Sequence, residues 1–353
     1  MKQRRGVFSI LVLVVFASSL ALFAQSKDDK KKDEAQKKEI QNIVKIVDEM
    51  AAGQPAPNDL SITWLREDVL KAQGNKEYVP FTVTIDSAKL GGGTVAFYWR
   101  VVPKNGAASA AEPAGQKKDD KKDKNKKPDY AYEDISFIPV TAAQNPMRVS
   151  RSFTVPAGNY DVFIVVKEPT PDKAPKNAPA PKISMLKQTV NVPDFWNGEL
   201  STSTVIMAAR IDPLPAPLTP QQQADRPYAL GAMEILPTFD TKLSKKSELS
   251  TFLLIYNPKV DGANKPDVTV EYNFYQKLAG APEKFFNKTN PQSLNAQTLP
   301  PQFDLASGHQ LQSGQAVPLA SFPEGDYRLE IKVTDKIANK TLTKEITFTV
   351  GPA

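Results

Sequence analysis

The segment PAGNYDVFIVV at residues 156–166 decides the fold, because a closely similar segment, PEGDYRLEIKV, returns at residues 323–333. Both copies begin with a Pro-x-Gly-x-Tyr turn and continue into a run in which apolar residues occupy every second position, as in a half-buried strand. Neighbouring blocks repeat in the same order and predict an internal duplication. The aligned positions are Glu77 with Glu248, Phe81 with Phe252, Val95 with Val270, Phe97 with Tyr272, Trp99 with Phe274, and Lys187–Val192 with Lys344–Val350.

Further alternating runs at residues 81–85, 95–101, 252–256, 270–274 and 346–350 bring each copy to about seven short strands, which favours an antiparallel β-sandwich. The Pro-x-Gly-x-Tyr turn and its strand resemble the late strands of the immunoglobulin-like and fibronectin type III-like domains of exported bacterial proteins. This resemblance implies an all-β fold of two tandem antiparallel β-sandwich domains and carries no catalytic or binding residue with it. We expect Tyr160 and Tyr327 to play matching structural roles, hydrogen-bonding a turn.

The repeat also predicts the domain boundaries. Residues 169–181 are rich in Pro and look like a linker, but their counterpart in the second copy is the hairpin connection at 334–341, so we place them in a loop of the first domain. Residues 103–129 form a Lys-rich insertion in the same domain. The predicted division is a signal peptide at 1–24, a charged segment with an amphipathic helix at 25–57, and β-sandwich domains at 58–196 and 197–353.

The N-terminus is typical of an export signal. Lys2, Arg4 and Arg5 precede the uncharged apolar run Val7–Ala24, as in a secretory signal peptide. The alternative is an uncleaved anchor, because the run approaches the ~20 residues that span a bilayer. Either interpretation predicts a periplasmic or extracellular protein, which contacts a membrane only if the segment is retained.

A helix is predicted before the first domain. Apolar residues recur at steps of three and four, placing one stripe on a helix that we expect to pack on the first domain. The stripe consists of Ile40, Ile43, Val44, Val47 and Met50. A docking helix for a partner, or a short coiled coil, is the alternative. The preceding stretch, Lys27–Glu39, is so highly charged that we expect it to be solvated.

The composition excludes several kinds of site. The chain has no Cys and one His, which excludes disulfides, thiol nucleophiles, thiolate zinc sites and His-rich metal sites. We expect His309 to be a surface-loop residue. Residues 261–267 lack the acidic spacing of an EF-hand, and Gly91–Gly93 lack the Lys of a phosphate-binding loop. The sequence therefore predicts no metal and no cofactor.

The charge balance argues against nucleic acid as a partner. The formal net charge is +6, and three of the basic residues belong to the predicted signal peptide, so the remaining chain carries only about +3. Nothing selects two catalytic carboxylates from the 39 acidic residues, so we predict no enzyme. A hydrolase with carboxylates on the sandwich loops is the weaker alternative.

Aromatic residues and lysines provide the candidate binding surface. Tyr98 alternates with Phe97 and Trp99 and should face the opposite side of its strand, where an aromatic ring can stack on a sugar or anchor an interface. The Lys-rich insertion could contact anionic envelope polymers or lipid headgroups. The candidate residues are Tyr98, Tyr130, Tyr132, Trp196, Lys117, Lys118, Lys121 and Lys122. The structural alternatives are a cross-strand pair for Tyr98, a packed domain junction for Trp196 and a solvated loop for the lysines.

These features together predict an exported, non-enzymatic protein that acts as a periplasmic or cell-surface scaffold. Its expected partner is an envelope or secreted protein. The alternative is a module that binds carbohydrate or another envelope polymer.

Overall fold

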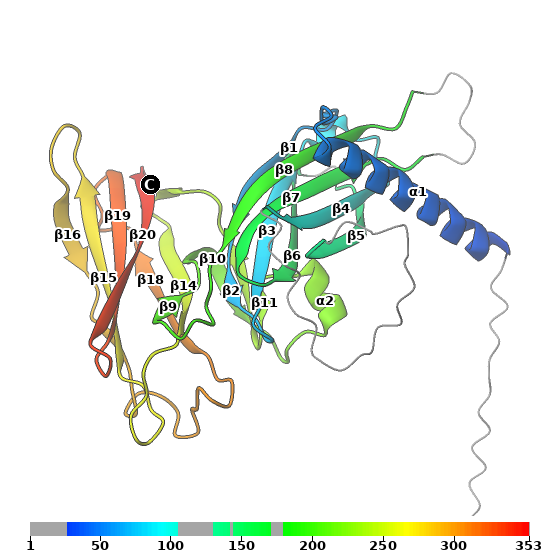
Figure 1. Cartoon of the computed structure of the whole chain (residues 1–353). Helices are drawn as coiled ribbons and strands as arrows, with labels where there is room; N and C mark the ends of the chain where they lie inside the picture. Colours follow the sequence, from blue (N-terminus) through cyan, green and yellow to red (C-terminus); the bar gives the residue numbers. More distant parts are fainter. Residues whose placement is uncertain (1–26, 105–129, 142–143, 171–178, 353) are drawn as a thin grey trace, which may run out of the picture.

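The computed structural model describes residues 27–104, 130–141, 144–170 and 179–352. Two pairs of β-sheets follow one another along the chain, and a long N-terminal helix lies against one sheet of the first pair (Figure 1). The predicted all-β sandwich class is confirmed. The predicted signal peptide lies outside the described residues, as do Lys117, Lys118, Lys121 and Lys122 of the insertion. Within the described ranges, no helix is long and apolar enough to cross a membrane.

Two four-stranded sheets, sheet A and sheet B, form the first sandwich. Sheet A has the order β5 (Tyr132–Pro139), β4 (Thr94–Pro103), β7 (Gly158–Lys167), β8 (Ile183–Val192). In sheet B the central β3 (Glu77–Ile85) pairs with β1 (Ile62–Glu67), β2 (Leu70–Lys71) and β6 (Met147–Val155), and a short 3₁₀ helix, Ser87–Lys89, follows β3. Strands β7 and β8 pair directly; residues 171–178 of the Pro-rich stretch 169–181 lie outside the described residues, and its assignment to a loop of the first domain stays a prediction.

The first core is aromatic. Phe81 on β3 is fully buried and stacks on Trp64 of β1, with ring centroids 4.9 Å apart. Its edge meets Trp99 of sheet A at 6.3 Å, so sheets A and B are joined through these rings. Full burial of one such side chain contributes roughly 1.5–3 kcal/mol to folding.

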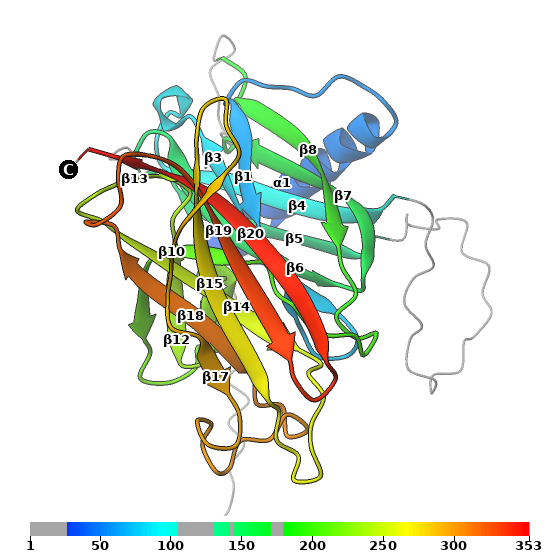
Figure 2. The same ribbon diagram turned by 90° about the vertical axis from the view of Figure 1, so that its left-hand side faces the viewer.

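The second sandwich consists of two six-stranded sheets, sheet C and sheet D. Sheet C contains β11 (Ala229–Leu230), β12 (Met233–Pro237), β10 (Ile206–Pro213), β14 (Glu248–Tyr256), β18 (Leu311–Pro318) and β9 (Ser201–Thr202). Sheet D contains β13 (Lys242–Ser244), β20 (Lys340–Gly351), β19 (Gly325–Asp335), β15 (Val268–Lys277), β16 (Lys284–Lys288) and β17 (Gln292–Leu294). The short helix α2 (Pro220–Asp225) lies between β10 and β11. Figure 2 shows sheet D facing the viewer.

The central strand of sheet C, β14, is buried on both faces. Successive side chains of a strand point to opposite faces, and β14 shows both. Phe252 and Leu254 join the apolar cluster that contains the first core, while Leu253 and Ile255 join the core between sheets C and D. The first cluster thus combines residues from both predicted domains; the division at residue 196 stays a prediction.

Helix α1 (Lys27–Ala51) packs on the outer face of sheet A, as predicted. Ile43 and Val47 are fully buried against that face. The helix begins earlier than the apolar stripe and includes Lys27–Glu39, which we expected to be solvated chain. Lys, Glu, Ala and Gln are good helix formers, so the charged stretch continues the helix that packing fixes at its other end.

Tyr160 and Tyr327 play the matching roles that the repeat predicts. The hydroxyl of Tyr160 donates to the carbonyl of Pro156 at 2.8 Å, and that of Tyr327 donates to the carbonyl of Pro323 at 2.8 Å. Each bond closes the turn that leads into a long strand, β7 or β19, and each ring is buried. The prediction of a turn bond is confirmed at both positions.

The variants Tyr160→Phe and Tyr327→Phe should each lower the free energy of unfolding by about 1 kcal/mol, the net contribution of one neutral hydrogen bond. The two losses should add, because the tyrosines lie in different sandwiches. Urea denaturation of the two single variants and the double variant measures both quantities. An unchanged midpoint in either single variant would contradict the structural role given to that hydroxyl.

Candidate functional site

Helix α1 covers the surface predicted around Tyr98. The side chain does point away from Phe97 and Trp99, as the alternation predicts, but it is only 1% exposed. Its ring belongs to the apolar cluster beneath Ile43 and Val47 of the helix. Tyr98 is therefore not an exposed binding residue, because the amphipathic stripe of α1 occupies that face.

Tyr130 belongs to an ion-pair cluster around the buried Arg100. The guanidinium of Arg100, 1% exposed, donates to Asp48 of α1 and to Glu133 of β5, both at 2.7 Å. It also lies on the Tyr130 ring, with Cζ 3.6 Å from the centroid. Burial raises the pKa of Tyr130 to about 12. These contacts hold α1 on sheet A and give Tyr130 a structural role.

Tyr132 packs on the first core. Its ring stacks on Trp99 with centroids 6.4 Å apart, and its hydroxyl donates to Asp134 at 3.3 Å. Burial, and then the Asp134 carboxylate, raise the pKa of the phenol well above its usual range. Of the four predicted aromatic residues, only Trp196 presents a large exposed ring.

Trp196 lies in the connection between β8 and β9, where the two sandwiches meet. Its side chain is 40% exposed, its indole N–H donates to the carbonyl of Lys76 at 3.0 Å, and its backbone N–H donates to Asp194 at 2.7 Å. The Lys71 ammonium lies 4.1 Å from the ring centroid, a cation–π contact. One face of the ring is therefore already occupied by the chain itself.

The neighbouring Phe195 fastens this connection to both sandwiches. Its ring packs on Tyr256 of sheet C at 4.9 Å, and its backbone N–H donates to Oε1 of Glu77 in sheet B at 3.0 Å. Asn257 donates to the carbonyls of Phe195 and Glu199, both at 2.9 Å. The junction is thus held by specific bonds on both sides.

Glu77 is a buried carboxyl at this junction. The residue is fully buried, and its Oε2 has no hydrogen-bond partner among the described residues. Burial, together with the nearby Asp194 carboxylate, raises its pKa to about 7 against the opposing effects of the Phe195 N–H and Lys71. Glu77 therefore changes charge near neutral pH.

A second junction contact centres on Asp68, which is fully buried. Its carboxylate accepts from Nε of Arg66 at 2.9 Å, from the Thr204 hydroxyl at 2.9 Å and from the Tyr228 hydroxyl at 2.8 Å. The Arg66 guanidinium also donates to the carbonyl of Val205 at 2.5 Å. Burial, with the Asp68 charge, holds the pKa of Tyr228 well above its usual range. This network joins the end of β1 to sheet C.

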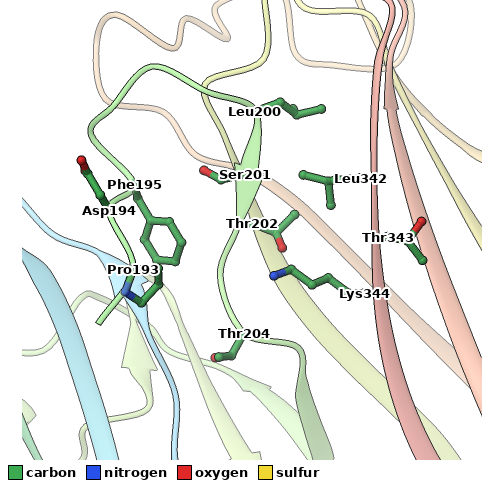
Figure 3. A pocket seen from close by; sticks show the side chains of 10 residues that line it. All are labelled: Pro193, Asp194, Phe195, Leu200, Ser201, Thr202, Thr204, Leu342, Thr343 and Lys344. Atoms are coloured by element: carbon green, nitrogen blue, oxygen red, sulfur yellow. The ribbon is translucent and has the colours of Figure 1, made fainter. Parts of the chain in front are cut away.

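A cavity of about 320 Å³ lies beside the same connection. Two segments far apart in the sequence form it: the stretch from the end of β8 through the β9 region, and part of β20 (Figure 3). Its apolar wall is contributed by Pro193, Phe195, Leu200 and Leu342. The volume falls at the lower end of the range for small-molecule sites, roughly 300–1,000 Å³.

Polar groups also face this cavity. Thr202 is 1% exposed, and the buried hydroxyls of Thr202 and Ser201 have no partner within the part of the chain that the structure describes. The half-buried Lys344 extends its ammonium toward the Thr202 side, while the neighbouring Thr343 points away (Figure 3). Lys344 has no ion pair with any described carboxylate, so the cavity combines one cation with the free hydroxyl of Thr202, while Ser201 points to the other side of β9 (Figure 3).

The open edge of sheet D is the second feature that could bind a ligand. Strand β16 pairs only with β15, and it lies at the outer margin of the second sandwich (Figure 1). Two exposed apolar side chains belong to this hairpin, Leu278 (43%) and Phe285 (49%). An edge strand has unpaired backbone donors and acceptors that can add a further strand.

The described residues provide no metal-binding cluster, and their one His is held within a turn. No cluster of three or more acidic or His side chains there could hold a metal ion. The Nδ1 of His309 accepts from the backbone N–H of Asp304 at 3.0 Å, within an exposed turn. That bond gives His309 a structural role in its loop.

Comparison with known proteins adds little. No family model and no curated sequence matches the chain. Trypsin-activated alpha-2-macroglobulin of Escherichia coli aligns with 85% of this chain and 17% of its own, at 12% identity and a TM-score of 0.22. Dimeric latent PorU of Porphyromonas gingivalis aligns with 87% and 21%, at 9% identity and a TM-score of 0.29. The chain thus spans about a fifth of either protein, and function has to be argued from its own residues.

Sequence reasoning missed the residues of both candidate sites. Lys344 had a detectable signal, because it stands in phase with Leu342 and Ile346 in an alternating run where an apolar residue is expected. Phe285 lies in a run too short to show alternation. Thr202 had no signal, because only the fold brings it to the cavity.

Proposed function

We propose that the chain is an exported, non-enzymatic interaction module that binds an extended, acidic segment of a partner protein along β16. The observation that carries this proposal is the open edge of β16, which bears exposed apolar side chains. An added strand gains backbone hydrogen bonds along such an edge, and side-chain contacts select its sequence.

The hairpin provides an anchor for a side chain of the added strand. Phe285 lies directly across the strand pair from Tyr275, with ring centroids 5.8 Å apart. The next residue, Phe286, faces inward and packs on Phe322 at 4.8 Å. Because the inner ring fixes the strand, the outer ring is held in place for a partner.

The charge of the edge selects the partner. Lys277, Lys284 and Lys288 are exposed and form no ion pair with any described carboxylate, whereas Glu283 is neutralised by Arg328 at 2.8 Å. Two copies of this edge would repel each other, since edge lysines disfavour self-pairing. An acidic segment would instead gain Coulomb attraction at each lysine, and its binding would weaken with salt.

Two further observations support this function over its alternatives. The basic start and apolar run at residues 1–24 favour export. The exposed large aromatic side chains of the described part belong to separate elements: Phe137 on β5, Trp196 in the connection after β8 and Phe285 on β16. They form no strip on which a sugar chain could stack, which argues against the glycan-binding alternative.

A photo-crosslinking amino acid at position 285 tests the proposal in cells that produce the protein. We expect a discrete adduct with one partner protein, and the partner's crosslinked peptide should be acidic. The matched position is Thr347, which is exposed on β20 at the opposite, partly unpaired margin of the same sheet. Position 347 should give no such adduct.

Reversing the charge of two edge lysines provides a second test of the proposed binding edge. The double variant Lys284→Glu/Lys288→Glu should weaken binding of the identified segment about tenfold or more, whereas Lys246→Glu, an exposed lysine elsewhere in the sandwich, should not. Adducts that form equally at 285 and 347, or binding that survives the double reversal, would contradict the proposed edge. Capture of a soluble glycan in place of a protein would favour the alternative function.

A further inference from the structure

We propose that the cavity beside the sandwich junction is a binding site for a carboxylate group carried on a small apolar body. The site is separate from the β16 edge, and nothing in the proposed function depends on it. The argument rests on one lysine, one hydroxyl and one apolar wall.

The position of Lys344 is the first observation. On β20 it shares the inward face with Leu342, Ile346 and Phe348, all of which pack on the second core. Strand β13 pairs with β20 only from Thr349 onward, so the ammonium lies at an unpaired stretch of the strand and faces the cavity. A half-buried cation is costly unless an anion compensates it, and no described carboxylate does so.

The hydroxyl of Thr202 is the second observation. Buried hydroxyls are almost always hydrogen-bonded in native proteins. The oxygen of Thr202 is nevertheless buried without a partner among the described residues, and the side chain lies on the Lys344 side of β9, whereas Ser201 points to the other side (Figure 3). The nearby Thr204 differs, because its hydroxyl is bonded to Asp68 and to the Val69 N–H. One carboxylate would satisfy the Thr202 hydroxyl and the ammonium together.

The polar groups match a single negative charge. The cavity has one cation and no Arg, and the Asp194 carboxylate lies at its margin, turned away from Lys344 (Figure 3). A phosphate dianion usually requires several cations or a set of backbone N–H groups. A carboxylate needs only one ammonium and one or two hydroxyl donors.

The apolar wall of the cavity determines which chemical group can be attached to the carboxylate. Phe195 presents its ring, and Leu200 and Leu342 present aliphatic side chains. A cavity of about 320 Å³ accepts one small aromatic or aliphatic group. Such a ligand is either a free organic acid or the C-terminal residue of a peptide, since both present a carboxylate next to an apolar side chain.

Titration of the purified chain with benzoate, followed by the ¹³C-methyl signals of Leu200, Leu342 and Thr202, tests this site. We expect benzoate to shift these signals and benzamide, its neutral counterpart, to leave them unchanged. A second pair of probes, a tetrapeptide ending in Phe with a free or an amidated C-terminus, distinguishes the two sources of the carboxylate. Tighter binding of the free-acid peptide than of benzoate would assign the site to a chain terminus.

Variants locate the binding. Lys344→Met should weaken binding of the preferred acid at least about tenfold, Lys344→Arg should retain most of it, and Thr202→Val should weaken it several-fold. The matched control is Lys340→Met on the same strand, because Lys340 is already paired with Glu199. Thermal unfolding of each variant checks that the fold persists.

Three results would overturn the proposal. They are failure of both acids to shift the methyl signals, equal binding of the neutral probes, and full binding by Lys344→Met. In the first case Lys344 acts only as an inward charge that keeps an edge strand from pairing with other chains.

Discussion

Replacing Asp68 with alanine is expected to lower the free energy of unfolding by about 3 kcal/mol, because it leaves a largely buried partner without its counter-charge. Arg66 would lose its carboxylate, and the hydroxyls of Thr204 and Tyr228 would lose an acceptor. The lost bonds connect the first sandwich to sheet C. We therefore also expect the cooperative unfolding of the two sandwiches to separate into two transitions.

Differential scanning calorimetry and urea denaturation measure both effects. A second Arg–Asp pair in the chain serves as the control. Arg210 and Asp212 are also two residues apart, like Arg66 and Asp68, and their N–O distance is 2.7 Å, but this pair is exposed. Asp212→Ala should cost no more than about 1 kcal/mol, as exposed ion pairs do. Equal losses in the two variants would show that burial at the junction gives Asp68 no special importance.

The chain should lose stability as the pH rises from about 5 to 8, and Glu77 should be a main cause. Its pKa is raised by burial to about 7 from an ordinary value of 4.5. Below pH 4.5 the carboxyl is protonated in both the folded and the unfolded state, so its contribution is complete. Between pH 4.5 and about 7 the carboxyl is ionised in the unfolded chain but still protonated in the folded chain. The free energy of unfolding therefore falls with rising pH until the folded carboxyl also ionises. The full change is about 3 kcal/mol.

Glu77→Gln should remove this slope. Glutamine keeps an oxygen that accepts from the Phe195 N–H, and it carries no charge at any pH. The variant should therefore be more stable than the parent chain at pH 8 and nearly as stable at pH 5. Glu248→Gln, at the aligned exposed position in the second copy, serves as the control and should leave the slope unchanged. A parallel pH profile of Glu77→Gln and the parent chain would contradict a buried titrating carboxyl.

Local sequence signals predicted the strands well, because alternation and turn chemistry act within a few residues. The Pro-x-Gly-x-Tyr segments show this most clearly: both strands form, and both tyrosines bond to the proline carbonyl at the start of the turn. The Pro-rich residues 169–181 were assigned to a hairpin through the repeat, where composition alone indicates a linker. In the turn segments the deciding interactions lie close together in the sequence, whereas the loop was assigned by comparison with the second copy.

The binding surface was predicted less well, since it depends on which elements cover one another. Alternation showed that Tyr98 turns away from the first core, but only the docking of α1 makes that face buried. The cavity required residues near 200 and 343 to meet at one place. The one local sequence signal for the cavity was Lys344, which stands in phase with apolar residues of its strand.

Sheet C also has a consequence for how the molecule can be divided. Because β14 supplies side chains to the cores on both of its faces, this sheet is a shared wall between two interiors. A truncated chain that ends at residue 196 would leave the first sandwich without the side chains of Phe252, Leu254 and Tyr256 that close its apolar cluster. Gene fragments that end there should give an insoluble first half. We therefore expect the two sandwiches to fold only as parts of the same chain.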